Sequence, residues 1–218
     1  MPKATDKFYK RDFWIQENLN YAQPHFRLEK SARIVNRIAR GKACDLLDVG
    51  CGPAALIPLL DSNIQYYGID IAIHNPAPNL RQGDFIENPI AFDDRQFDII
   101  LAQGVFEYIG QFQSAKLLEI SRLLRQGGVF VASYVNFDHL NRYEYEIYNN
   151  IQSVEEFSTD VKRYFRIDSV IPTSHHWRHN EPKRRLNKII DMHINIQLPI
   201  ISSLFTVENF FVCSPLRP

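Results

Sequence analysis

The sequence predicts a doubly wound α/β fold, with helices on both faces of a mostly parallel sheet. The first observation is a set of continuous apolar runs, which are typical of strands buried on both faces of a parallel sheet. They lie in the segments CDLLDVG, QYYGIDI, FDIILAQ and GGVFVASYV. Helical patterns alternate with these runs, as they do in βαβ units. All nine glycines lie between Gly41 and Gly128, so the turns that need bare backbone fall in the middle of the chain.

An amphipathic helix is expected before the first strand, over residues 24–40. Pro24 suits its first turn and Gly41 suits its end. Apolar and small side chains recur at three-to-four spacing at Leu28, Ala32, Val35 and Ala39. Basic side chains follow helical spacing at Lys30, Arg33, Arg37 and Arg40. We interpret this basic stripe as a solvated face of the helix.

Two further helices are expected between the strands, over residues 54–60 and 113–126. Gly127 should end the second of them in the left-handed conformation. After Val135 the chain becomes polar and aromatic, which indicates an insertion into the domain. Within it, Ser153 precedes two glutamates and is expected to cap a short helix.

The last part of the chain predicts two more strands. They are expected over residues 164–171 and 205–213, where apolar side chains alternate in the second segment. A basic helix over residues 182–197 is expected to separate them.

Composition narrows the class of protein. A length of 218 residues favours one domain, and 45% hydrophobic with 23% charged residues is typical of a globular chain. The 25 basic and 25 acidic side chains cancel, which removes a global attraction to nucleic acid or anionic membranes. No apolar run reaches the ~20 residues that span a bilayer, so we expect a cytoplasmic protein. Reduced thiols are expected at Cys44, Cys51 and Cys213.

A glycine turn follows the first apolar run, in the segment LLDVGCGPAAL. Gly50 and Gly52 let backbone N–H groups approach a ligand, and the N-terminus of a following helix favours anionic groups. With Ala55 they satisfy the relaxed dinucleotide-binding pattern. Asp70 lies about twenty residues on, where a carboxylate binds ribose hydroxyls. The pattern leaves open a nicotinamide dinucleotide, another adenosine cofactor, or a purely structural turn.

Acidic residues add to this pattern. Asp48 precedes the first glycine by two residues, where a carboxylate repels a pyrophosphate and favours a cation. Further acidic signals follow at Asp84 and Asp98. The ordered series LLDVGCGPA, YYGIDI, GDF, FDIILAQGVFEYI and RLLRQGGVFVASY resembles the motifs of class I S-adenosylmethionine-dependent methyltransferases. The resemblance implies a seven-stranded, mostly parallel sheet with one antiparallel strand.

The resemblance also implies how the chain is organised. A single methyltransferase domain is expected over residues 1–218. Residues 1–43 would form an N-terminal helical lid and residues 44–135 the cofactor-binding core. Residues 136–218 would supply a substrate-side insertion and the last two strands.

The implied cofactor is S-adenosylmethionine, held along the carboxyl ends of the first four strands. The turn at Gly50, Cys51 and Gly52 would pass under the amino-acid part of the cofactor. Asp48 would lie near the cofactor's ammonium group, and Asp70 would accept hydrogen bonds from both ribose hydroxyls.

At the other positions, the resemblance implies contacts to adenine and methionine. Asp84 would bind the adenine amino group, with Phe85 and Ile71 beside the ring. The methionine part would be lined by Gln103, Gly104, Val105 and Phe106. Tyr21 and Arg27 resemble a lid that meets the methionine carboxylate; alternatively, Tyr21 packs in the protein and Arg27 is solvated.

Two departures from the family pattern stand out. Ala54 replaces the third glycine of the usual turn, and Tyr108 stands where many relatives carry histidine. A general base is needed only when the acceptor is a hydroxyl or a protonated nitrogen. The candidates for that base are His25, His74, Tyr108 and His139. Each of them could equally be a surface or structural residue.

The acceptor is expected to be a small molecule or biosynthetic intermediate, methylated on oxygen or nitrogen. The segment AQGV lacks the N/D-P-P-Y/F signature of relatives that methylate nucleic-acid amino groups, and Glu107 lacks the partner glutamate of arginine-methylating relatives. We therefore expect no nucleic-acid partner, and no metal. The segment SHHWRHNEPKRR could hold an anionic acceptor group. An NAD(P)-dependent oxidoreductase and a non-catalytic S-adenosyl-ligand-binding protein remain alternatives.

Overall fold

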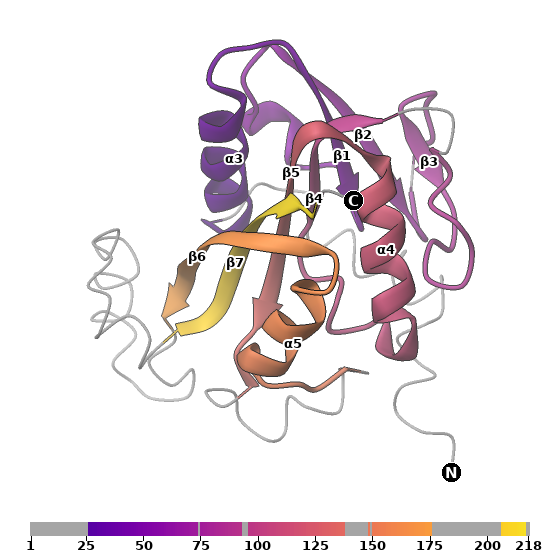
Figure 1. Ribbon diagram of the computed structural model, residues 1–218. Coiled ribbons are helices and arrows are strands. Elements are labelled where there is room, and N and C mark those ends of the chain that lie inside the picture. Colours follow the sequence, from indigo (N-terminus) through magenta and orange to yellow (C-terminus); the bar gives the residue numbers. More distant parts are fainter. Residues whose placement is uncertain are drawn as a thin grey trace, which may run out of the picture.

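The computed structural model describes residues 26–73, 75–92, 96–137, 148, 150–175 and 206–216. Seven strands form one sheet in the order β3-β2-β1-β4-β5-β7-β6 (Figure 1). The strands are β1 (Cys44–Val49), β2 (Ile64–Asp70), β3 (Leu80–Gln82), β4 (Phe97–Ala102), β5 (Leu124–Val135), β6 (Phe165–His175) and β7 (Thr206–Pro215). The helices are α3 (Phe26–Ala39), α4 (Gln113–Leu123) and α5 (Val154–Val161), with the 3-10 turns η1 (Ile57–Leu59) and η2 (Gly110–Phe112).

The strand directions confirm the expected mostly parallel sheet. β1 pairs in parallel with β2 and β4, β2 with β3, and β4 with β5. β7 runs antiparallel to both of its neighbours, β5 and β6, so it is the one reversed strand. The carboxyl ends of β1, β2 and β4 therefore meet at one edge of the sheet, where open α/β sheets bind their ligands.

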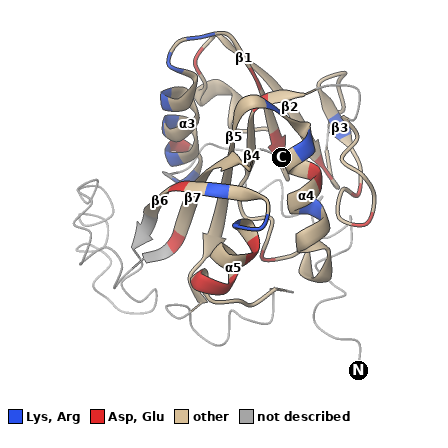
Figure 2. Cartoon of the chain, in the orientation of Figure 1, with Lys and Arg blue, Asp and Glu red and all other residues tan. Residues whose placement is uncertain are grey.

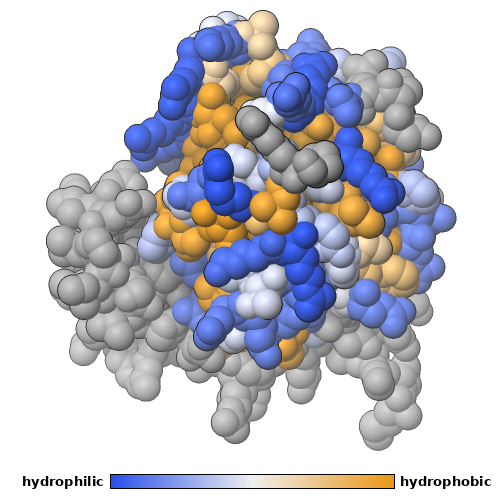
Figure 3. All heavy atoms as spheres, viewed as in Figure 1, coloured by the Kyte–Doolittle hydropathy of each residue, from blue (hydrophilic) through white to orange (hydrophobic). Residues whose placement is uncertain are grey.

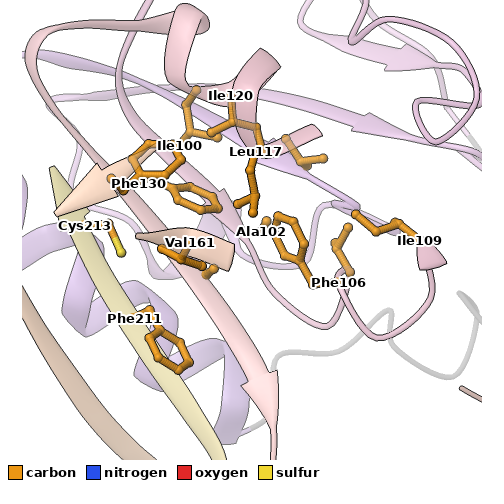
Figure 4. Close-up of a cluster of buried hydrophobic side chains, with 14 of the residues drawn as sticks. Ile100, Ala102, Phe106, Ile109, Leu117, Ile120, Phe130, Val161, Phe211 and Cys213 are labelled. Carbon is orange, nitrogen blue, oxygen red and sulfur yellow. The ribbon is translucent and has the colours of Figure 1, made fainter. Parts of the chain in front are cut away.

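Two apolar layers cover the sheet, as its continuous apolar strands predict. Along β4, Ile99 and Leu101 pack with Val35 of α3, because successive side chains point to opposite faces. Ile100 and Ala102 pack on the other face, with α4 and α5 (Figure 4). α3 thus covers one face of the sheet, and α4 and α5 cover the other.

The basic stripe of α3 lies on its outer side. Figure 2 shows Lys and Arg along this helix, and hydrophilic side chains cover the same region in Figure 3. Arg33, Arg37 and Arg40 are exposed, and Lys30 is half-buried. The interpretation of this stripe as a largely solvated face agrees with these positions.

Two helix boundaries differ from the expectation. The helix expected over residues 54–60 is only the 3-10 turn η1, which contains Pro58, a residue that cannot donate a helical hydrogen bond. The helix expected over residues 113–126 ends at Leu123. Leu124 is extended and pairs with Phe97 in the sheet, so its apolar side chain belongs to a strand.

The elements α5, β6 and β7 agree more closely with the expectations from the sequence. Ser153 caps α5 in a reciprocal capping box, in which the Glu156 N–H donates to Ser153 Oγ and the Ser153 N–H donates to Glu156 Oε2. β6 and β7 occupy the two segments expected as final strands. The helix expected over residues 182–197 lies outside the described residues.

Three further observations concern membrane-spanning helices, the cysteines and possible metal ligands. No helix within the described ranges has the length and apolar character that crossing a membrane requires. Cys44, Cys51 and Cys213 are free thiols, as expected. Among the described residues, no three His, Cys, Asp or Glu side chains gather as metal ligands would.

Candidate functional site

The site begins at the turn after β1. The Gly50 and Cys51 N–H groups donate to the Ile69 carbonyl oxygen, at 2.8 and 3.2 Å. Gly50 has a φ of +76°, and a Cβ atom there would lie 2.6 Å from Val105 Cγ2 and 3.8 Å from Phe85 Cζ. Only glycine fits this crossing. The turns after β1, β3 and β4 therefore converge at Gly50.

Asp70 lies at the end of β2 with its carboxylate held by the main chain. The Gly52 N–H donates to Asp70 Oδ2 at 2.9 Å, and the Ala72 N–H donates to Asp70 Oδ1 at 2.8 Å. The residue is only 8% exposed. Because two main-chain N–H groups hold the carboxylate at the end of β2, its orientation suits the expected pair of ribose hydroxyls.

Asp48 lies beside Asp70, near the end of β1. Tyr66 on β2 donates its hydroxyl proton to Asp48 Oδ2 at 2.8 Å, inside the protein. Burial raises the pKa of Asp48 to about 7, the Tyr66 hydrogen bond opposes the rise, and the Asp70 charge adds to it. A cation placed next to this carboxyl would favour its ionised form. The sequence reasoning missed Tyr66, although it stands in the apolar run of the second strand.

The segment after β3 supplies the positions expected beside adenine. Asp84 Oδ1 accepts the Ile86 and Glu87 N–H groups, at 3.0 and 3.4 Å. No described residue donates to Asp84 Oδ2, so that oxygen remains for an amino group. Phe85 is buried and Ile71 is half-buried. Their positions after β3 and β2 place these apolar side chains at the same edge of the sheet.

The segment after β4 follows the expected path, with one exception among its side chains. The Gly104 N–H donates to Ser133 Oγ at 2.9 Å, and Ser31 of α3 donates to Gln103 Oε1 at 2.6 Å. Phe106 is fully buried in the core, where it packs near Phe130 (Figure 4). Only the backbone of Phe106 can therefore line a ligand site.

Arg27 reaches the same segment from α3. Its guanidinium nitrogen Nη2 lies 3.5 Å from where a Cβ atom of Gly104 would be. Arg27 donates two hydrogen bonds to Glu208 of β7, at 3.0 and 2.6 Å, and its side chain is 33% exposed. Burial alone would raise the pKa of Glu208, but the Arg27 charge, the hydrogen bonds from Arg27 and Ser133 and the Lys30 charge together lower it. The sequence reasoning missed Glu208, which is 181 residues away from its partner.

Glu107 follows this segment and is completely buried. Its Oε1 atom accepts the Val135 N–H at 2.9 Å. Its Oε2 atom has no hydrogen-bond partner in the part of the chain that the structure describes. Burial is the main cause that raises the pKa of Glu107 to about 7. Tyr108 beside it is half-buried, with its ring 5.4 Å from that of Tyr148.

Other expected site residues are placed elsewhere or lie outside the described ranges. Asp98 is at the amino end of β4, where Arg125 bridges it to Asp45 at 2.6 Å on each side, so this acidic signal is structural. Four expected residues, and the basic cluster from residue 176 onward, lie outside the described residues. These residues are Tyr21, His25, His74 and His139.

Known proteins share features of this sequence and this fold. A family model described as a methyltransferase domain matches residues 47–132. No curated protein sequence is a significant match. A chain in the complex between the Haloferax volcanii Trm112 methyltransferase activator and a methyltransferase superposes with a TM-score of 0.64 and 18% identity, covering 99% of this chain and 98% of that one.

Two further solved structures share the fold. An S-adenosylmethionine-dependent methyltransferase from Clostridium acetobutylicum has a TM-score of 0.58 and 14% identity, covering 92% of this chain and 96% of that one. The N-methyltransferase NodS from Bradyrhizobium japonicum, in complex with S-adenosylhomocysteine, has a TM-score of 0.55 and 13% identity over 88% of both chains. The strand order, the family model and these neighbours together show that the chain has the class I S-adenosylmethionine-dependent methyltransferase fold, with a methyltransferase domain over residues 47–132.

Proposed function

We propose that this protein transfers a methyl group from S-adenosylmethionine to an oxygen or nitrogen atom of a small-molecule or biosynthetic-intermediate acceptor. One observation carries the proposal. The turn at Gly50 meets Val105 and Phe85 beside the oriented carboxylate of Asp70, at the carboxyl ends of the parallel strands. This arrangement fits an adenosine compound that carries a positive charge near Asp48.

The residues divide by the part of the cofactor that each would hold. Asp70 binds the ribose hydroxyls, because both of its oxygens are already aimed by backbone N–H groups. Asp84 binds the adenine amino group through Oδ2, with Phe85 and Ile71 beside the ring. The turn of Gly50, Cys51 and Gly52 passes under the amino-acid part of the cofactor. The methionine part is lined by Gln103, Gly104, Val105 and the Phe106 backbone.

In this proposal Arg27 binds the carboxylate of the methionine part. Its guanidinium already lies over Gly104 and carries the charge that a carboxylate requires. Tyr21 would join it from the N-terminal lid. In this proposal residues 1–43 would form that lid, residues 44–135 would hold the cofactor, and residues 136–218 would complete the acceptor pocket.

The proposed reaction requires the protein mainly to position the methyl acceptor. The cofactor, when bound, supplies a methyl group that its sulfonium charge already activates. The chain holds the acceptor in line with that group and excludes water, and such positioning can lower a barrier by about 7–11 kcal/mol. Tyr108, His25 and His139 are the proposed bases for an acceptor that must lose a proton.

Ligand-induced thermal stabilisation tests this function against its alternatives. S-adenosylhomocysteine at 100 times its dissociation constant is expected to stabilise the protein by about 2.7 kcal/mol, and NADH is expected to have no effect. Stabilisation by NADH alone would identify a nicotinamide-dependent oxidoreductase. Stabilisation by S-adenosylhomocysteine with no methyl transfer to any compound of a metabolite extract would identify a non-catalytic binding protein.

A further inference from the structure

Glu107 presents an unusual carboxyl group beside the proposed cofactor site. Within the described ranges, its Oε2 atom is the single buried side-chain nitrogen or oxygen that lacks a hydrogen-bond partner. A buried polar atom left in this state costs about 1–3 kcal/mol, and more when it is charged. The Val135 N–H occupies Oε1 only, so a glutamine would satisfy that contact equally well. Apart from a weaker influence of Glu107's own N–H group on the carboxylate, nothing in the described ranges forms a hydrogen bond with the second oxygen.

Among the described residues, no cation pairs directly with Glu107. Arg27 of α3 attracts its charge, but that guanidinium forms two hydrogen bonds to Glu208 of β7. Tyr134 of β5 is close enough for the Glu107 charge to raise the pKa of its phenol. Arg27 and Glu208 pair with each other and Lys30 also faces Glu208, so none of the described cations forms an ion pair with Glu107 itself.

The cluster also lies next to the proposed methionine site. Glu107 is three residues beyond Gly104, in the segment that follows β4, and its Oε1 atom binds the last residue of β5. Arg27 connects it to the proposed methionine site, since its guanidinium lies over Gly104. The partly exposed Arg27 side chain marks the side from which this cluster meets solvent.

We propose that Glu107 Oε2, in place of Tyr108, His25 or His139, accepts a hydrogen bond from the methyl acceptor and takes its proton, and that this acceptor is an amine. The inference rests on the proposed function and names its substrate class. An ammonium group supplies both the N–H donor that Oε2 lacks and a cation paired with Glu107, which the described residues do not provide. A carboxylate or phosphate at this place would instead add negative charge to an uncompensated one. An alcohol would fill the hydrogen bond but leave the charge unpaired.

The proton balance of the step is simple. The acceptor enters as R–NH3+, and one of its protons moves to the Glu107 carboxylate, which leaves R–NH2 with a lone pair. That lone pair forms a bond to the methyl carbon as the carbon–sulfur bond breaks and its electrons stay on sulfur. The products are R–NH2+–CH3, the neutral thioether and protonated Glu107, which then releases its proton to solvent. A carboxyl group whose pKa lies near 7 is suited to such an exchange at neutral pH.

The test compares the wild-type protein with Glu107→Gln and with Glu155→Gln, a matched control on the exposed surface of α5. Calorimetric titration with S-adenosylhomocysteine is done first and is expected to give the same affinity for all three proteins. Absence of binding to the wild type would refute the proposed function itself, independently of Glu107. Thermal unfolding at pH 8 is expected to show Glu107→Gln at least as stable as the wild type, because the variant removes a buried charge. A variant less stable than wild type would assign Glu107 a structural role.

Methyl transfer is then measured with methyl-labelled cofactor on a panel of primary and secondary amines and a matched panel of alcohols and phenols. We expect label on amines only, and a rate of Glu107→Gln lowered roughly 10²–10⁴-fold. The wild-type kcat/KM is expected to rise through pH 7, and the variant is expected to lose that rise. Transfer to hydroxyl compounds only, transfer to no amine, or an unchanged rate in Glu107→Gln would each overturn the inference.

Discussion

Asp48→Asn is predicted to make the ligand-free protein more stable at alkaline pH and to weaken cofactor binding. Burial raises the pKa of Asp48 from 3.8 to about 7. At about 1.4 kcal/mol for each pKa unit, ionising this carboxyl in the folded state costs roughly 4 kcal/mol more than in the unfolded chain. Asparagine removes that cost and keeps an oxygen for the Tyr66 hydroxyl, but its buried amide nitrogen costs about 1–3 kcal/mol.

The sign of the pH dependence follows from linkage. Between about pH 4 and pH 7 the folded state binds the Asp48 proton that the unfolded chain has released, so this group's contribution to stability falls as pH rises. Its penalty is complete above pH 7 and absent below pH 4. Asp48→Asn should therefore gain stability over the wild type at pH 8.5 and lose that gain at pH 5.

Urea unfolding at these two pH values is the assay. Glu107 titrates near the same pH, so the prediction concerns only the difference between variant and wild type. Asp61→Asn, an exposed carboxylate, is the matched control and should show no such difference. If Asp48→Asn were destabilised equally at both pH values, the argument from a buried, reluctantly ionised carboxyl would be refuted.

Three further substitutions have defined outcomes. Gly50→Ala should abolish detectable S-adenosylhomocysteine binding and lower the melting temperature, because its Cβ would lie 2.6 Å from Val105 Cγ2; calorimetry showing wild-type affinity would contradict this. Phe157→Ala should cost about 3–5 kcal/mol in urea unfolding, since this fully buried ring stacks 4.1 Å from Tyr134. A loss below 1 kcal/mol would speak against that packing. Arg40→Gly should raise the melting temperature by a few degrees, because exposed Arg40 has a φ of +50° at the end of α3 and a left-handed residue costs about 1–2 kcal/mol; an unchanged or lower value would argue against strain there.

Local signals account for the parts of the fold that the sequence predicts well. Continuous apolar runs mark β1, β2, β4 and β5 because both faces of these strands are covered. The reach of α4 was overestimated because the side chain of Leu124 fits an apolar helical stripe and a buried strand equally well. Ala54 stands where the family pattern has its third glycine, and its φ of +56° is a left-handed conformation that strains a residue with a Cβ atom.

The candidate site also contains residues that sequence motifs predict and residues that they do not. Gly50, Asp70 and Asp84 carry motif spacing, and the structure brings their segments to one edge of the sheet. Tyr66 and Glu208 carry none, because their partners are set by strand pairing and by a contact across nearly the whole chain. Glu208 lies opposite Val135 in the register of β5 and β7, and that pairing places it beside Arg27 at the beginning of α3.

Binding of S-adenosylhomocysteine to the wild type and to Asp70→Ala tests the central claim most directly. Isothermal titration should show a single site in the wild type and a strongly reduced affinity in Asp70→Ala, because the carboxylate that accepts the Gly52 and Ala72 N–H groups and orients the ribose is lost. Asp61→Ala, with its exposed side chain, should bind as the wild type does. No binding to the wild type, or equal affinity in Asp70→Ala, would contradict the account of this edge of the sheet as the cofactor site.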